Sequence, residues 1–179
     1  MQYGRDVSTR QIAEAAGIAE GTIFRVFPNK DAVIEAVIED TFDDSPTVVA
    51  LTAIDPAQDL PARLAAAVEV LQARMRRVIS LVGALHRSPQ SPPADTDNQG
   101  HKQRGRADNA LITTALIAVI GSDARRLRVP APQAADLIRG LVFAIAHPAV
   151  GATIPAEPRV IVDLLLNGIL TPTNQESPC

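Results

Sequence analysis

The feature that most constrains this chain is a glycine between two short apolar patterns near the N-terminus. Ile12 and Ala13 precede Gly17, and Ile23 and Phe27 follow that glycine by six and ten residues. This spacing buries the inner faces of two helices joined by a turn of three or four residues. It predicts the geometry of a DNA-reading helix-turn-helix.

We expect helices over residues 8–16, 19–27 and 30–42 in this N-terminal head. The first begins with a capping-box pattern, because Ser8 is followed three residues later by Gln11. The glycine ends the first helix and a proline stops the second. The expected core of the head is apolar: Ile12, Ala13, Ile18, Ile23 and Phe27.

The rest of the sequence, after this N-terminal head, indicates an all-α body. Residues 45–61 contain three prolines and are expected to form a linker, which would hinge a head of residues 1–44 on a body of residues 45–179. From Leu60 to Leu85, apolar residues recur every three or four positions, which predicts an amphipathic helix of about seven turns. No sustained alternation typical of strands occurs.

Three further helices and one loop are expected in the body. The loop spans residues 88–106, which lack aliphatic side chains and are rich in proline, glycine and polar residues. The helices span residues 107–120, 132–147 and 157–170. The last two are apolar around most of their circumference, so other helices are expected to pack against them on two sides.

Composition excludes several classes of protein. Hydrophobic residues make up 46% and charged residues 21% of the chain, as in ordinary globular proteins. No apolar run reaches the roughly 18 to 20 residues that span a bilayer, because Arg139 and Asp163 interrupt the best candidates. The N-terminus has no apolar secretion signal, and a single cysteine, Cys179, fits a reducing compartment. We therefore expect a cytoplasmic protein.

The head carries an unexpected charge for DNA binding. Residues 1–44 hold four basic side chains and nine acidic ones, which gives a net charge of −5. Phosphate neutralisation usually supplies much of the affinity for DNA, so this charge weakens the expected binding. The acids cluster in residues 31–44, and the surface that faces DNA can still be locally positive.

The segment AEAAGIAEGTIFRVFPNKDAVIEAV resembles the head of TetR-type (tetracycline-repressor-like) transcriptional regulators. The resemblance rests on the pattern G-x-x-x-G-T-[IL]-[YF]-x-x-F-x-x-K, and it covers the head densely and the body only in its all-helical style. It implies a DNA-binding regulator with a helical ligand-binding and dimerisation body. Motifs for a phosphate loop, a nucleophile elbow or a metal cluster do not occur, so we do not expect an enzyme.

The resemblance assigns DNA contacts residue by residue. Arg25 is the candidate for reading a base, because a guanidinium pairs with guanine O6 and N7. The alternative is a solvated surface arginine. Phe24 departs from the tyrosine common in the family, and Val26 replaces a residue that is often polar. The implied contacts, to phosphate, sugar or base, are Ser8, Thr9, Arg10, Gly21, Thr22, Phe24, Arg25 and Lys30.

The resemblance also implies a helix before the first one predicted here. Only MQYGRD precedes that helix, so the head is expected to be truncated at its N-terminus. Without the earlier helix that the resemblance implies, part of the apolar core of the head stays in contact with water, which lowers the stability of the head by about 25 cal/mol for each Å2 of exposed apolar surface. Weak operator binding by this chain is the expectation that follows.

In the body, the resemblance implies a homodimer through residues 132–147 and 157–170, with Gly140 and Ala144 permitting close approach. Packing of both helices within one chain is the alternative. A two-fold dimer would match a palindromic operator.

An inducer pocket is the other implied feature of the body. Aromatic residues make up only 3%, so the pocket would be aliphatic and its ligand a small apolar molecule. The alternative is that the candidate residues belong to the core, which is the more common place for any one of them. His86, His101 and His147 lack partners at metal-ligand spacing, so neither a metal nor another cofactor is expected. The candidate walls are Leu71, Met75, Leu81, Leu85, His86, Leu116, Phe143 and His147.

Together these features predict a ligand-responsive transcriptional regulator, and a repressor in particular, acting by a shift between two spacings of its heads. The alternative is a ligand-binding or dimerisation protein of the same fold that has lost DNA binding, which the head charge and the missing helix favour. A steep loss of DNA affinity with salt would distinguish the regulator from this alternative.

Overall fold

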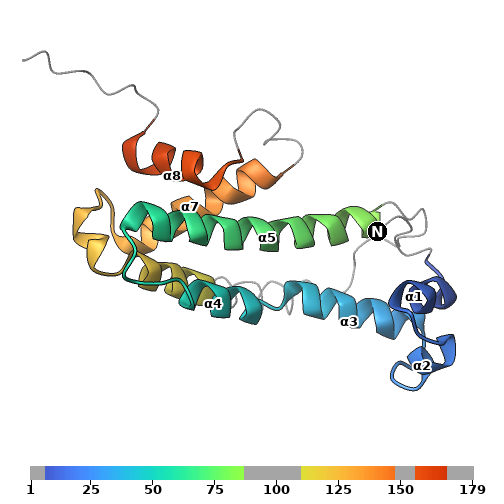
Figure 1. The fold of residues 1–179 in the computed structure, drawn as a ribbon. Coiled ribbons are helices and arrows are strands. Elements are labelled where there is room, and N and C mark those ends of the chain that lie inside the picture. Colours follow the sequence, from blue (N-terminus) through green and yellow to red (C-terminus); the bar gives the residue numbers. More distant parts are fainter. Residues whose placement is uncertain (1–6, 87–109, 148–155, 169–179) are drawn as a thin grey trace, which may run out of the picture. The chain divides into compact units, whose positions relative to one another are not determined.

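The computed structural model describes residues 7–86, 110–147 and 156–168 (Figure 1). All regular secondary structure in these ranges is helical, so the predicted all-α class is confirmed. The chain divides into two compact units: Met1–Val49 with Ala73–Ile112, and Ala50–Gln72 with Thr113–Cys179. The predicted loop at 88–106 lies outside the described residues.

The first unit begins with the expected helical head, formed by α1 (Thr9–Ala16), α2 (Glu20–Phe24) and α3 (Lys30–Phe42). The capping box is confirmed: the Gln11 amide donates to Ser8 Oγ at 3.2 Å, and the Ser8 amide donates to Gln11 Oε1 at 2.9 Å. These bonds satisfy amides that have no partner within the helix.

The turn between α1 and α2 depends on Gly17. Its φ of 68° is left-handed, and it ends α1 as predicted. The second helix is shorter than the predicted 19–27, because the amides of Arg25 and Val26 bond to carbonyls only three residues back, at Thr22 and Ile23. The chain thus leaves the α-helix before the proline. Asn29 then caps α3 by accepting the Ala32 amide at 2.9 Å.

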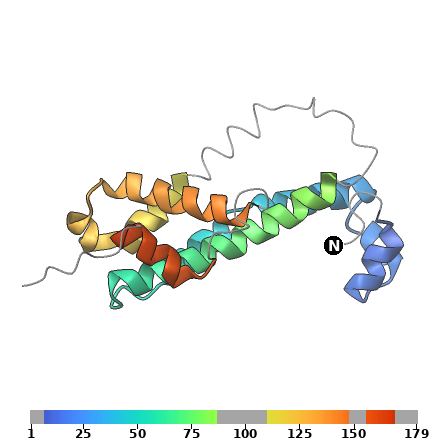
Figure 2. The ribbon, with the colours of Figure 1, turned by 90° about the horizontal axis from the view of Figure 1, so that it is seen from above.

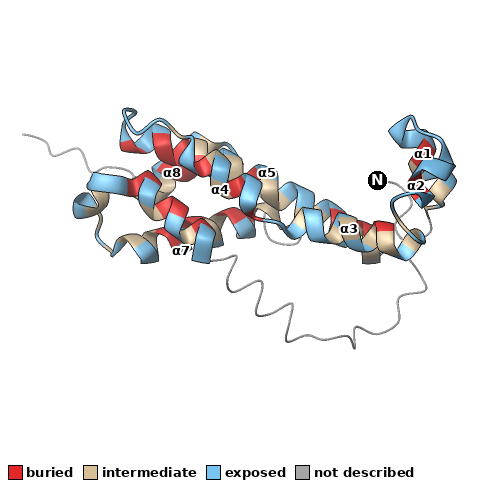
Figure 3. Ribbon diagram, turned by 90° about the horizontal axis from the view of Figure 1, so that it is seen from below, coloured by how far each residue is buried: buried red, intermediate tan, exposed pale blue. Residues whose placement is uncertain are grey.

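A small apolar core joins the three head helices. Ala13, Ile23 and Val33 are buried, and Ile12 and Phe27 pack against them half-buried. The prediction that Ile18 belongs to this core is wrong, because its side chain is 45% exposed. Ile18 follows the left-handed glycine, and its amide turns back to the Ala13 carbonyl at 3.0 Å while its side chain stays at the surface. Figure 3 shows how little of α1 and α2 is buried.

The predicted linker at 45–61 is partly wrong, since it contains α4 (Ser45–Thr52). Its prolines do not break the helices, because Pro46 lies in the first turn of α4 and Pro61 in the first turn of α5. A missing N–H at those positions costs no helical hydrogen bond. Asp59 caps the start of α5 by accepting the Ala62 amide at 2.9 Å.

The long helix α5 (Leu60–His86) has the predicted length, and Figure 2 shows it from above. The predicted helix at 107–120 is described from residue 110, and it continues into η2 (Gly121–Arg126), a 3-10 turn that the sequence did not predict. The last helices are α7 (Ala131–Ala146) and α8 (Pro158–Asn167), each with proline in its first turn. Both agree with the prediction to within one residue at their described ends, except that α8 ends at Asn167, before Gly168 with its φ of 80°.

The second unit has an aliphatic core. Fully buried side chains come from α4, α5, the helix at 110–120, α7 and α8, so each of these helices turns one face inward. The largest of them are Leu51, Val68, Leu116, Ile120, Val142 and Ile161.

Candidate nucleic-acid interface

The helix α2 and its C-cap residue, Arg25, have an outward face on which four of the predicted DNA contacts lie. Gly21, Thr22 and Arg25 are exposed, and Phe24 is 50% exposed. Ile23 is the exception, because its side chain is 5% exposed and anchors α2 in the head core. The structure therefore brings these four predicted residues together on the surface.

Gly21 has no structural need to be glycine. A Cβ atom built there would meet no other atom within 4 Å, and the residue does not have a positive φ. Glycine inside a helix costs roughly 0.5–1 kcal/mol relative to alanine. Neither the packing nor the backbone conformation of the described residues therefore requires glycine at this position.

The predicted phosphate contacts lie at the helix starts, and their hydroxyls already have partners. Ser8 Oγ donates to Gln11 Oε1 at 3.2 Å, and Thr9 Oγ1 donates to Glu20 Oε1 at 2.6 Å. Arg10 is exposed at the start of α1, and Lys30 is half-buried at the start of α3. The predicted phosphate contacts at the helix starts are thus two basic side chains and two hydroxyls that already donate hydrogen bonds.

Half of the acidic side chains of residues 7–44 lie on α3. Asp31, Glu35 and Glu39 are exposed and recur every four residues along α3, which places them on one face of that helix. Over the described residues 7–44 there are three basic and eight acidic side chains, so the net charge is −5. Just beyond α3, hydrogen bonds from the Ser45 hydroxyl and amide lower the pKa of Asp43.

A buried ion pair follows the end of α3 within the first unit. Asp44 is 2% exposed, and its Oδ1 accepts a hydrogen bond from the Nε of Arg74, on α5. Asp44 also starts α4, because its carbonyl accepts the Val48 amide at 2.9 Å. No sequence signal points to this pair, since thirty residues separate its members and neither stands in a motif.

The predicted pocket residues fall in both units. Leu71, Leu116, Phe143 and His147 belong to the second unit, whereas Met75, Leu81, Leu85 and His86 belong to the first. Leu71, Leu81 and Leu116 are buried, and Met75 and Leu85 are half-buried. Phe143 is 53% exposed and lies with its ring centroid 5.8 Å from that of His147. The side chain of His86 lies outside the described residues.

A groove that the sequence did not predict lies within the second unit, between the start of α5 and α8. Its volume is about 570 Å³, and none of the predicted pocket residues lines it. Ala62 and Ala66 are among its apolar lining residues, and Asp59, Glu69 and Arg159 are among its charged ones. This groove is therefore more polar than the expected apolar pocket.

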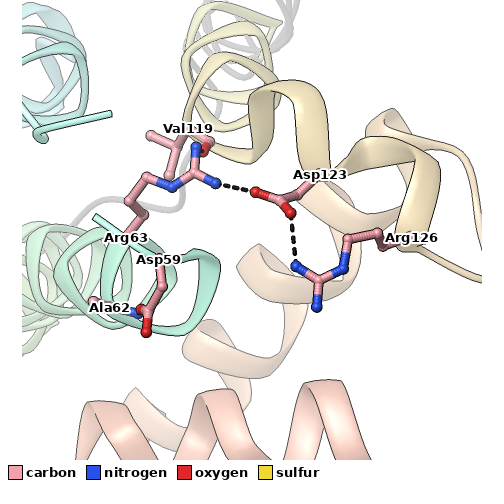
Figure 4. A network of polar contacts seen from close by, with 6 residues as sticks. All are labelled: Asp59, Ala62, Arg63, Val119, Asp123 and Arg126. Atoms are coloured by element: carbon pink, nitrogen blue, oxygen red, sulfur yellow. Dashed lines mark hydrogen bonds and ion pairs between the residues drawn. The ribbon is translucent and has the colours of Figure 1, made fainter. Parts of the chain in front are cut away.

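A polar network, shown in Figure 4, connects α5 to η2 within the second unit. Arg63, although buried, donates from Nη1 to the Val119 carbonyl at 2.9 Å and from Nη2 to Asp123 Oδ2. Arg126 donates to the other oxygen of the same carboxylate at 2.8 Å. The hydrogen bond from Arg126, with the positive charges of Arg126 and Arg63, lowers the pKa of Asp123.

The helix α7 has one buried face and one exposed apolar face. Ala135, Ile138, Val142 and Ile145 are buried, whereas Leu137 is 57% exposed. Gly140 is also exposed, and a Cβ atom at this position would have no other atom within 4 Å. The exposed side of α7 thus includes the glycine that the resemblance placed at a dimer interface.

Other kinds of site find no support in the described ranges. Within them, no three His, Cys, Asp or Glu side chains lie where they could share a metal ion. No described helix has both the length and the apolar character needed to cross a membrane.

Comparisons with known proteins agree with this geometry. The sequence model of the family described as bacterial regulatory proteins, tetR family, matches residues 2–37. The crystal structure of the probable transcriptional regulatory protein RHA5900 has a TM-score of 0.50 at 19% identity, over 94% of this chain and 90% of that one. NalD, the secondary repressor of the MexAB-OprM multidrug efflux pump in Pseudomonas aeruginosa, has a TM-score of 0.48 at 17% identity, over 93% and 87%.

A search of curated proteins found no match to this chain. The likeness to RHA5900 shows a shared fold over nearly the whole of both chains. The family match covers the three head helices up to the middle of α3, which include the outward face of α2. Residues 2–37 therefore match the sequence model of the tetR family of bacterial regulatory proteins, and the chain shares its all-helical fold with RHA5900.

Proposed function

We propose that this chain is a ligand-responsive repressor that binds a palindromic operator as a homodimer. The observation that carries the proposal is the exposed face of α2, where Gly21, Thr22 and Arg25 lie at the surface above a buried Ile23. A short helix held by one apolar anchor, with its polar residues directed outward, is suited to a major groove.

Each exposed residue has a proposed role. Arg25 reads a base edge, and Thr22 contacts phosphate or a base. Gly21 lets the backbone approach the DNA closely, which would explain a glycine that the fold itself does not require. Phe24 packs on sugar or a thymine methyl group, and Arg10 and Lys30 contact phosphate. The hydroxyls of Ser8 and Thr9, at the start of the same head, already donate to Gln11 and Glu20.

The dimer is proposed to form through residues 132–147 and 157–170. The exposed side chains of Leu137 and Phe143 on α7 support it, because apolar side chains of this size gain about 1.5–3 kcal/mol each on full burial. Val160 on α8 is 39% exposed and adds to the apolar surface. Gly140 leaves room for a partner helix.

We further propose that residues 1–44 act as the DNA-binding domain and residues 45–179 as the domain for ligand and dimerisation. A small apolar inducer would bind among the aliphatic side chains around Leu71 and Leu116, which are both buried. Binding of inducer and of DNA would then oppose each other, because each favours a different spacing of the two heads.

A second candidate function is a protein of the same fold that no longer binds DNA. The net charge of −5 over residues 7–44 favours it, since Arg10, Arg25 and Lys30 are the only basic residues in that range that could neutralise phosphate. The outward face of α2 favours the repressor instead, because a lost DNA site has no need for an exposed Gly21.

Selection from a random-sequence DNA library, followed by titration at several salt concentrations, tests the proposal. A repressor selects a palindrome, and its binding constant falls steeply as salt rises. Selection of no sequence at any salt concentration would favour the second candidate and reject the repressor.

A further inference from the structure

A side-chain hydrogen bond ties the starts of the two helix-turn-helix elements together. Thr9, the first residue of α1, donates its hydroxyl proton to the carboxylate of Glu20, the first residue of α2, at 2.6 Å. Eleven residues separate the pair along the chain. Among the described residues, no other side-chain hydrogen bond joins α1 to α2.

The bond has a consequence for the role of Thr9. A threonine hydroxyl carries a single proton, and phosphate oxygens accept hydrogen bonds but do not donate them. While Thr9 donates to Glu20, it cannot also donate to a phosphate. A contribution of Thr9 to DNA binding would therefore act through Glu20.

The helix α2 needs such support. It is only five residues long, and Ala19 at its N-cap offers no side-chain hydrogen bond. Its apolar anchor is Ile23, which leaves the first turn without a buried side chain. A tether at Glu20 fixes the end of α2 that the apolar core does not hold.

We infer that Glu20 is a positioning residue for DNA recognition, which holds α2 on α1 through the hydroxyl of Thr9. The inference rests on the proposed function, because it concerns how α2 presents Arg25 to DNA. Glu20 itself brings a negative charge close to phosphate. The hydrogen bond of Glu20 supports DNA binding by holding α2 in place, whereas the negative charge of Glu20 opposes DNA binding.

These two effects of Glu20 can be separated by substitution. Glu20→Gln keeps an oxygen that accepts the hydroxyl proton and removes the charge, whereas Glu20→Ala removes both. Thr9→Ser keeps the hydroxyl, and Thr9→Val keeps the shape without it. The full chain and its variants would be titrated with the palindrome that the wild-type chain selects from a random library.

Thr9→Val is expected to weaken binding by about five-fold in the wild-type and Glu20→Gln backgrounds, which is the effect of one hydrogen bond. In the Glu20→Ala background, Thr9→Val is expected to have no further effect, because the acceptor is already gone. Thr9→Ser should bind like the wild type, and Glu20→Gln at least as tightly. An equal loss from Thr9→Val in all three backgrounds would show direct phosphate contact and overturn the inference, as would no loss at all.

A second measurement tests the tether without DNA. Amide hydrogen exchange over residues 20–24 of the free full chain should be faster in Thr9→Val and Glu20→Ala than in Thr9→Ser and Glu20→Gln. Unchanged exchange in all variants would refute the tether. Failure of the wild-type chain to select any DNA would instead refute the proposed function, so the two failures are distinguishable.

Discussion

Arg74 of α5 forms an ion pair with Asp44, a carboxylate that is 2% exposed and lies two residues beyond the end of α3. The Arg74 side chain is itself only 16% exposed. The pair thus connects the end of the head to the long helix, inside the first unit. Removal of the arginine would leave a buried charge without its partner.

Arg74→Met should therefore lower the free energy of unfolding by about 3 kcal/mol, because it strands the Asp44 carboxylate in the interior. Arg77→Met is the matched control, since Arg77 is exposed on the same helix and should change stability by less than about 0.5 kcal/mol. Chemical denaturation of the full chain measures both. Equal effects of the two substitutions would contradict a role for the buried pair.

The network at Asp123 allows a similar comparison between its two arginines. Arg63→Met should lower the free energy of unfolding by about 2–3 kcal/mol. The Arg63 side chain is only 8% exposed and also donates a hydrogen bond to the Val119 carbonyl. Arg126→Met should cost much less, since the Arg126 side chain is 73% exposed. Denaturant titrations of the two variants would show the difference, and a larger loss for Arg126→Met would contradict it.

The same network predicts a dependence of stability on pH. The pKa of Asp123 is lower in the folded chain than its ordinary value of 3.8, so the ionised carboxylate stabilises the fold. This contribution is complete above pH values near 3.8, and it is lost as the pH falls through the lowered pKa. Asp123→Asn should show a weaker loss of stability over this acidic range than the wild type, in thermal melts taken from pH 5 downward. Identical pH profiles would refute the assignment.

Two glycines of the head should respond in opposite ways to alanine. Gly17→Ala should destabilise the head by about 1–2 kcal/mol, because alanine is strained at the left-handed φ of 68°. Gly21→Ala should leave stability unchanged or slightly higher, because a Cβ there meets nothing and alanine favours a helix. DNA affinity should nevertheless fall in Gly21→Ala. Thermal melts and DNA titrations of the same samples separate the two effects, and unimpaired binding by Gly21→Ala would refute a close approach of DNA to this position.

The proposed dimer can be tested at the exposed face of α7. Leu137→Glu and Phe143→Glu should each give a monomer, because they place a charge in an interface that is proposed to be apolar. Leu111→Glu is the control, since Leu111 is 55% exposed outside that face. Sedimentation equilibrium should show twice the chain mass for the wild type and the control. A wild-type monomer would contradict the dimer.

Much of the head could be predicted because its signals are local. The Ser8 and Gln11 capping box and the helix-ending Gly17 each act over three or four residues, and both are present in the structure. The same locality is misleading at 45–61, where prolines in first helical turns resemble helix breakers. Ile18 could not be placed correctly, because an apolar residue in a turn gives no indication of which way its side chain lies.

The ion pairs could not have been predicted from local patterns. Arg74 and Asp44 are thirty residues apart, and Arg63 and Asp123 are sixty apart. Charged residues at such separations are ordinarily solvated, and only the packing of helices decides which of them meet. The hydrogen bond between Thr9 and Glu20 could not be predicted from the sequence either, because the family resemblance implies that Thr9 contacts phosphate.

The most direct test of the central claim compares the base preferences of the wild-type chain and Arg25→Ala over all single substitutions of the selected operator. If α2 presents Arg25 to a base edge, the variant should lose about 1–3 kcal/mol of discrimination at one position of each half-site and keep its preferences elsewhere. A uniform loss at every position, or unchanged preferences, would contradict the placement of Arg25 against the bases.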